Sequence, residues 1–138
     1  MDWEKFLREY YQAWSSQDAD AVMDFFTEES TFEDLAFAVK FAGLEQIRSF
    51  VDLTYAGSPD FHIQPTEIIL DNNKAAATWT MSGTHSGDFP GLPATGKCFE
   101  VRAVSIVKFE GKTIKEMTDY WNLVDFQRAV GLIAPSGE

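Results

Sequence analysis

Apolar side chains recur at helical spacing along the first part of the chain. The spacing i, i+3, i+4, i+7, i+8 and i+11 places them on one face, formed by Trp3, Phe6, Leu7, Tyr10, Tyr11 and Trp14. Asp2 stands just before them and can accept hydrogen bonds from the free N–H groups of a first turn, as N-cap residues do. The pattern predicts an amphipathic helix that begins after Asp2.

Two further helices are predicted before residue 60. One begins near Asp18 or Asp20. The other begins after Gly43 and ends at residues 57–59, where a Gly-Ser-Pro sequence stops a helix. The inward faces are formed by Ala21, Val22, Phe25 and Phe26 in the first helix and by Leu44, Ile47, Phe50 and Val51 in the second.

Alternation with period two follows from residue 60 onward. Strands are predicted over residues 61–70, 74–85, 97–109 and 113–124, after two short extended segments at residues 31–34 and 36–41. Three N-terminal helices followed by a strand meander predict an α+β fold, with the helices packed on one face of a curved, mainly antiparallel β-sheet. Such a cone would enclose an apolar pocket. We expect a single domain over residues 1–138, with a frayed end at residues 134–138.

One charged residue interrupts the apolar face of the last predicted strand. Met117, Asp119, Trp121 and Leu123 share that face because strand side chains alternate. A carboxyl group there loses hydration, which raises its pKa and makes Asp119 a candidate acid–base residue. A structural alternative stays open, in which Asp119 only accepts a hydrogen bond from a neighbour or faces solvent at a β-bulge.

Composition narrows the classes of function. The chain has 138 residues, with 45% hydrophobic and 14% aromatic residues, enough for a core and for pocket walls that suit flat or apolar ligands. A net charge of −11 argues against nucleic acid and anionic membranes as partners. Two histidines and the single Cys98 give no convincing metal-ligand cluster and no intramolecular disulfide. Without a leader pattern, a long apolar run or a dinucleotide motif, we expect a cytoplasmic protein that uses neither metal nor cofactor.

Three motifs resemble one group of proteins. They are residues 17–26 with 31–34, the Gly-Pro loop at 83–97, and the last hairpin at 110–122. Together they cover nearly the whole chain and resemble the nuclear transport factor 2-like superfamily, in particular its SnoaL-like polyketide cyclases and ketosteroid isomerases. The resemblance implies the cone-shaped fold. It also implies a homodimer formed through the exposed face of the sheet, toward which Arg102, Val104, Ile106 and Lys108 are expected to point.

The resemblance also implies roles for particular residues. Ketosteroid isomerases move a proton beside a carbonyl with one carboxylate, while a tyrosine and a protonated acid hold the developing oxyanion. In this sequence the base corresponds to Asp34, the tyrosine to Tyr10, and the protonated acid to Ser105. A serine hydroxyl donates a weaker hydrogen bond than a carboxylic acid does. SnoaL-like cyclases close a ring by an aldol reaction without a cofactor, and their acid–base aspartate corresponds to Asp119. His85 is the candidate for the histidine expected near it.

We therefore expect Asp119 and Asp34 to be the polar groups of an apolar pocket, with Tyr10 and His85 as helpers. Its walls are expected from Trp14, Phe37, Trp79, Ser105 and Trp121. The predicted function is cofactor-independent proton transfer on an apolar or aromatic carbonyl compound, as in an isomerase, aldol cyclase or similar lyase. The alternative is a ligand-binding or subunit-interaction module without catalysis. In that case Asp34 would cap a turn, Tyr10 would be plain core and His85 would brace the loop.

Overall fold

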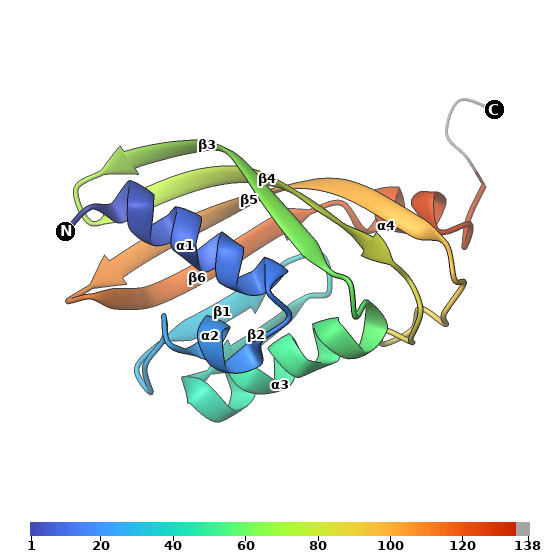
Figure 1. Ribbon diagram of the computed structural model, residues 1–138, viewed down its shortest axis with the longest axis horizontal. Coiled ribbons are helices and arrows are strands. Elements are labelled where there is room, and N and C mark those ends of the chain that lie inside the picture. The colour runs from blue at the N-terminus through green and yellow to red at the C-terminus, as the bar shows by residue number, and fades with distance from the viewer. Residues whose placement is uncertain (135–138) are drawn as a thin grey trace.

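The computed structural model describes residues 1–134, so the fraying expected for residues 135–138 lies outside the described part. In chain order the elements are α1 (Trp3–Ser15), α2 (Ala19–Met23), β1 (Thr31–Asp34), β2 (Val39–Ala42), α3 (Gly43–Gly57), β3 (His62–Asp71), β4 (Lys74–Thr84), β5 (Cys98–Glu110), β6 (Thr113–Trp121) and α4 (Leu123–Ala129) (Figure 1). Within residues 1–134 no helix is long and apolar enough to cross a membrane.

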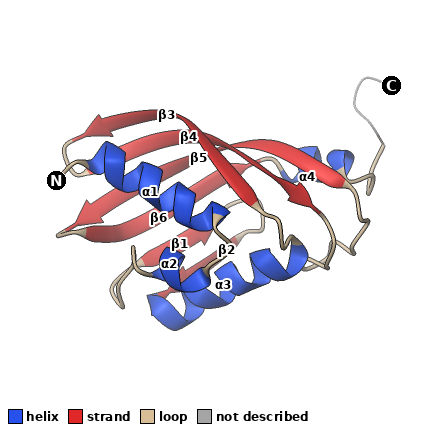
Figure 2. Ribbon diagram, viewed as in Figure 1, coloured by secondary structure: helices blue, strands red, loops and turns tan. Residues whose placement is uncertain are grey.

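The six strands form one sheet in the order β2-β1-β6-β5-β4-β3. All neighbours pair antiparallel except β1 and β6, which pair parallel. Figure 2 shows that the long strands curve and that α1, α2 and α3 lie on one side of them. The predicted α+β fold, with helices on a curved and mainly antiparallel sheet, is confirmed.

The first predicted helix is also confirmed. The side chain of Asp2 accepts a hydrogen bond from the backbone N–H of Lys5 at 3.0 Å and so caps α1. The apolar face buries Leu7, Tyr10, Tyr11 and Trp14. Burying such side chains stabilises the fold by roughly 1.5–3 kcal/mol each, which fixes α1 against the concave face of the sheet.

A fourth helix replaces the end of the last predicted strand. The strand was expected to reach residue 124, but β6 ends at Trp121 and α4 follows. The side chain of Asn122 accepts hydrogen bonds from the backbone N–H groups of Val124 and Asp125, which starts the helix. This helix buries Phe126 against the end of the sheet.

The extended segment predicted over residues 36–41 is shorter in the structure. Residues 35–38 form a turn, and β2 begins only at Val39. The reason is Asp34, whose Oδ1 accepts a hydrogen bond from the backbone N–H of Phe37 at 2.9 Å. Aspartate often closes turns in this way.

The convex face of the sheet carries apolar side chains in contact with solvent. Arg102, Ile106 and Lys108 of β5 are exposed, as their alternation predicted, and Val104 is half-buried. The exposed apolar side chains in register on this face include Ile69 of β3, Ile106 of β5 and Tyr120 of β6. The homodimer expected through this face stays a prediction.

Candidate active site

Three polar residues lie side by side across the middle of the sheet. In the strand registers Asp34 of β1 is the partner of Asp119 of β6, and Asp119 is the partner of Ser105 of β5. Neighbouring strands lie about 4.8 Å apart, and paired residues point to the same face. All three residues are buried, with exposed fractions of 3%, 8% and 0%. The fold thus brings together two carboxyl groups that are far apart in sequence.

Asp119 is held by a chain of two hydrogen bonds with a fixed direction. The indole Nε1–H of Trp79 donates to Ser105 Oγ at 2.8 Å, and Ser105 Oγ donates to Asp119 Oδ1 at 2.6 Å. An indole N–H can only donate, so Ser105 accepts from Trp79 and gives its own hydrogen to Asp119. Oδ1 of Asp119 is therefore an acceptor, and a proton on this carboxyl group belongs on Oδ2.

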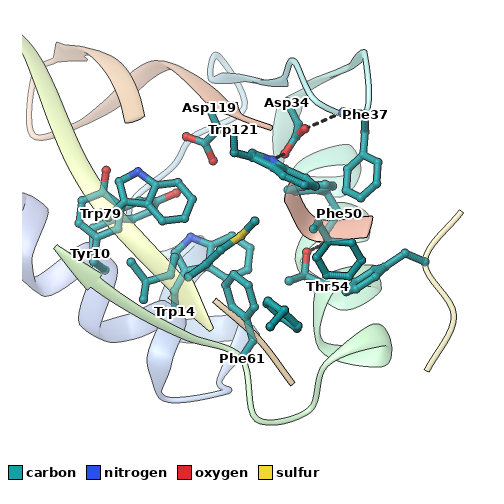
Figure 3. Close-up of a pocket in the computed structure, with 16 residues that line it drawn as sticks. Tyr10, Trp14, Asp34, Phe37, Phe50, Thr54, Phe61, Trp79, Asp119 and Trp121 are labelled. Carbon is teal, nitrogen blue, oxygen red and sulfur yellow. Dashed lines mark hydrogen bonds between the residues drawn. The ribbon is translucent and has the colours of Figure 1, made fainter. Parts of the chain in front are cut away.

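Asp34 is held differently, because both of its oxygens accept. Trp121 Nε1–H donates to Oδ2 at 2.9 Å, and the backbone N–H of Phe37 donates to Oδ1 at 2.9 Å (Figure 3). Hydrogen bonds to both oxygens favour the charged carboxylate. The two neighbouring carboxyl groups thus have opposite hydrogen-bonding environments.

Burial raises both carboxyl pKa values, and the hydrogen bonds separate them. Burial raises the pKa of Asp119 from 3.8 to about 8; the bond from Ser105 opposes this and the charge of Asp34 adds to it. Burial also raises the pKa of Asp34, but the bonds from Trp121, Phe37 and Ala36 oppose the rise. The hydrogen bonds therefore favour the charged form more at Asp34 than at Asp119, where burial holds the proton up to about pH 8.

Both carboxyl groups line one aromatic cavity. Its empty space measures about 580 Å³ with the open mouth included, and the centre of a water molecule can occupy about 50 Å³ of it. The smaller volume, about 50 Å³, leaves room for roughly four waters, so the cavity fits a ligand of about one ring unless its walls move. Figure 3 shows Asp34 and Asp119 on one side and Trp14 and Phe61 across from them.

The cavity contains most of the wall residues expected from the sequence and several others. Tyr10, Trp14, Phe37, Trp79 and Trp121 line it together with the two aspartates. The sequence interpretation had not assigned to it Tyr11, Phe50, Thr54, Phe61, Ile63, Met81, Phe89, Phe99 and Phe126. Ser105 lies behind Asp119 rather than in the wall, since it is fully buried and its hydroxyl bonds Trp79 and Asp119.

His85 does not line the cavity, which corrects its expected place beside Asp119. Its Nε2 lies 3.1 Å from the carbonyl oxygen of Leu92, and its Nδ1 lies 3.4 Å from Thr95 Oγ1. Its ring stacks on Phe89 at a centroid distance of 5.3 Å. The strand ends at Thr84, so the His85 side chain turns into the loop that follows. There it holds Phe89, which lines the cavity.

No metal-binding group is found near the carboxyl pair. Among residues 1–134, no set of three or more His, Cys, Asp or Glu side chains is placed to hold a metal ion. The cavity wall offers two carboxyl groups, two tyrosine hydroxyls, a threonine hydroxyl and otherwise aromatic or aliphatic surface. Chemically, these groups can accept a proton, donate a proton and exclude water from a flat ligand.

The raised pKa of Asp119 predicts how stability changes with pH. The folded protein binds this proton up to about pH 8, whereas the unfolded chain releases it near 3.8. Between those values the free energy of unfolding should fall as pH rises, by at most roughly 1.4 kcal/mol per pH unit from this group. Asp119→Asn should remove that slope, because its amide does not ionise and still accepts from Ser105. Urea unfolding between pH 5 and 8 measures the difference.

Asp71→Asn is the matched control for this stability measurement, because it removes a carboxylate at the exposed end of β3. It should keep the wild-type slope. Equal slopes in wild type and Asp119→Asn would show that Asp119 is not protonated in the folded protein at neutral pH.

Solved structures share this fold at low sequence identity. A hypothetical protein with a ketosteroid isomerase-like fold from Catenulispora acidiphila, in complex with trimethylamine, is 21% identical at a TM-score of 0.83 over 93% of each chain. A candidate SnoaL-like polyketide cyclase from a Jannaschia species is 21% identical at a TM-score of 0.81, over 96% of this chain and 91% of its own. IdmH, a candidate polyketide cyclase from Streptomyces antibioticus, is 19% identical at a TM-score of 0.81, over 95% and 99%.

At these identities the structural likeness extends to the fold alone. A search of curated proteins found no match. The sequence model of the SnoaL-like polyketide cyclase family matches residues 4–130, nearly the whole chain, and so confirms the resemblance drawn from the motifs. The chain therefore belongs to the SnoaL-like polyketide cyclase family.

Proposed function

We propose that the protein is a cofactor-independent enzyme that moves a proton at the carbon next to a carbonyl group of a small aromatic or apolar compound. Asp34 is the base and Asp119 is the acid. The direction of the hydrogen bonds from Trp79 through Ser105 to Asp119 carries this assignment, since it leaves Oδ2 of Asp119 as the atom that holds the proton. Asp34, with donors on both oxygens, stays ionised and can accept one.

The proposed step balances without another reagent. The Asp34 carboxylate takes a proton from the α-carbon, and the electron pair of the C–H bond forms the carbon–carbon double bond of an enol. The carbonyl oxygen takes the proton of Asp119 Oδ2, so one carboxyl group gains the charge that the other loses. Aromatic walls keep water away and strengthen both transfers. Each group contributes by its position and by a pKa matched to its role.

The enol can then react in either of two ways, and the resemblance to ketosteroid isomerases and SnoaL-like cyclases implies both reactions. Return of the proton from Asp34 to a different carbon gives an isomerase. Attack of the enol carbon on a second carbonyl of the same molecule gives an aldol ring closure. The limited free space supports a substrate of about one ring, with larger molecules requiring Phe37 or Phe89 to move.

Exchange of α-protons for deuterium tests the shared first step without the natural substrate. Acetophenone and phenylacetone in heavy water, followed by proton NMR, should lose their α-proton signals faster with the protein than with the Asp34→Asn/Asp119→Asn double variant. Equal rates for the two proteins and both ketones would overturn the proposed chemistry.

A second candidate is a non-catalytic site for a small alkylammonium cation. Eleven of the sixteen cavity residues are aromatic, two are carboxylic, and none is Lys, Arg or His. Aromatic faces and carboxylates together favour such cations, and the Catenulispora protein was crystallised with trimethylamine. Here binding would displace the proton of Asp119.

The two candidates predict opposite effects of pH on binding. Tetramethylammonium should bind more tightly as pH rises through about 8, because Asp119 becomes charged. A neutral oxygen ligand such as 4-methylphenol should bind less tightly over the same range, because Asp119 loses the proton that it donates. NMR titration with both compounds distinguishes the candidates: binding of tetramethylammonium that strengthens with pH, together with no measurable binding of 4-methylphenol, would favour the second candidate.

A further inference from the structure

The hydroxyl group of Tyr11 is buried without a hydrogen-bond partner in the described part of the chain. Among residues 1–134 it is the single buried side-chain polar atom without a hydrogen bond. Tyr11 is only 1% exposed. Native proteins bond nearly all buried polar groups, because an unmet one destabilises the fold. This exception therefore needs a physical reason.

Tyr11 lies close enough to the acid of the proposed reaction for the charge of Asp119 to act on its hydroxyl group. Tyr11 lines the same cavity as Asp119, and its ring lies 5.8 Å from that of Trp79, between centroids. Burial raises the pKa of Tyr11 far above its ordinary value, the charge of Asp119 raises it further, and Ser105 opposes the rise. The hydroxyl is therefore neutral at every working pH and keeps a hydrogen to donate.

Protein groups around Tyr11 leave this donor unused. The one hydrogen of Ser105 goes to Asp119, so Ser105 has none to donate to Tyr11. Its oxygen accepts from Trp79 and lies outside hydrogen-bond geometry with the Tyr11 hydroxyl. Tyr55, a tyrosine from α3, provides a contrast, because its hydroxyl donates to the carbonyl oxygen of Trp14 at 2.7 Å. An acceptor that enters the cavity is thus the missing partner of Tyr11.

We infer that Tyr11 donates a hydrogen bond to the oxygen of the bound ligand, next to the one from Asp119 Oδ2, so that the site selects carbonyl or phenol oxygens over apolar rings of equal shape. The inference rests on the proposed function for the role of Asp119. It differs from the resemblance, which assigned the tyrosine donor to Tyr10. Two donors on one oxygen match the two lone pairs of a carbonyl and the charge that develops on an enolate.

The affinity of 4-methylphenol relative to toluene measures this selection, because the two differ by one hydroxyl oxygen. In wild type the phenol should bind more tightly, as followed by NMR shifts of the tryptophan indole groups. Tyr11→Phe should reduce the affinity ratio roughly tenfold, the value of one neutral hydrogen bond, and leave toluene binding intact. Tyr55→Phe is the matched control and should keep the wild-type ratio.

Thermal unfolding without ligand gives an independent readout. Tyr11→Phe removes an unmet donor and should raise the melting temperature, whereas Tyr55→Phe breaks a bond and should lower it. An unchanged affinity ratio in Tyr11→Phe would overturn the inference. A melting temperature lowered as much as in Tyr55→Phe would also overturn it, because the hydroxyl would then have a partner in the free protein.

These outcomes separate the inference from the proposed function. If Tyr11→Phe keeps the affinity ratio while Asp34→Asn abolishes α-proton exchange, the inference fails and the acid–base chemistry stands. If neither wild type nor any variant speeds α-proton exchange of the ketones, while Tyr11→Phe loses the preference for 4-methylphenol over toluene, the proposed acid–base reaction is wrong and Tyr11 remains a ligand contact.

Discussion

Asp34→Asn is expected to lower α-proton exchange of acetophenone roughly 10²–10⁴-fold, the range that a positioned general base contributes. The amide cannot take the proton from carbon. It also presents only one acceptor where the carboxylate meets two donors, from Trp121 and Phe37. The variant should therefore melt at a lower temperature, and its rate should be measured well below that temperature.

Glu33→Gln is the matched control for this effect. Glu33 is the preceding residue on β1 and points to the opposite face of the sheet, so the variant removes an equal charge without touching the cavity. Its exchange rate should stay near that of wild type. A loss in Glu33→Gln as large as that in Asp34→Asn would mean that charge or folding, rather than the base, sets the rate.

Asp119→Asn is expected to lower the same rate roughly 10²–10⁴-fold, the range that a positioned general acid contributes. Its amide oxygen accepts from Ser105 as before, and its N–H can donate a hydrogen bond to the ligand oxygen but cannot transfer its proton. It should also change the pH profile. Wild-type exchange requires a protonated Asp119, so its rate should fall above about pH 8. The amide of the variant does not ionise, so the residual rate should not fall there.

Ser105→Ala sharpens this prediction. The hydrogen bond from Ser105 lowers the pKa of Asp119, so its loss should move the alkaline fall of the rate to higher pH. Exchange rates between pH 5 and 9.5 for wild type and both variants measure these effects. An alkaline fall near pH 8 that persists in Asp119→Asn would assign it to another group.

Hydrophobic periodicity was sufficient to predict most of the fold. The spacing of apolar residues in α1 and the alternation along β4 and β5 each follow from one local geometry. The fourth helix was missed because residues 120–124 continue an alternation that suits a strand equally well. The N-cap of Asn122 competes with that pattern, and packing of Phe126 decides between them.

The site was predictable in its parts but not in its arrangement. Asp119 stood out because a charge on an apolar strand face is costly. Its pairing with Asp34 depends on the parallel register of β1 and β6, which no local pattern specifies. Neighbouring residues Tyr10 and Tyr11 both fall on the apolar face of α1, so spacing could not tell which hydroxyl lacks a partner. His85 turned into the loop because the strand ends one residue earlier than predicted.

Carbon-13 NMR of the aspartate side-chain carboxyl groups, recorded between pH 3 and 10, tests the assignment of acid and base most directly. The two carboxyl groups are coupled, so the pair should release its protons in two separate steps. The carboxyl signal of Asp119 should shift last, near pH 8. The signal of Asp34 should shift at lower pH, with a midpoint above the ordinary aspartate pKa of about 3.9. Titration of Asp119 near pH 4, or of Asp34 after Asp119, would contradict the assignment.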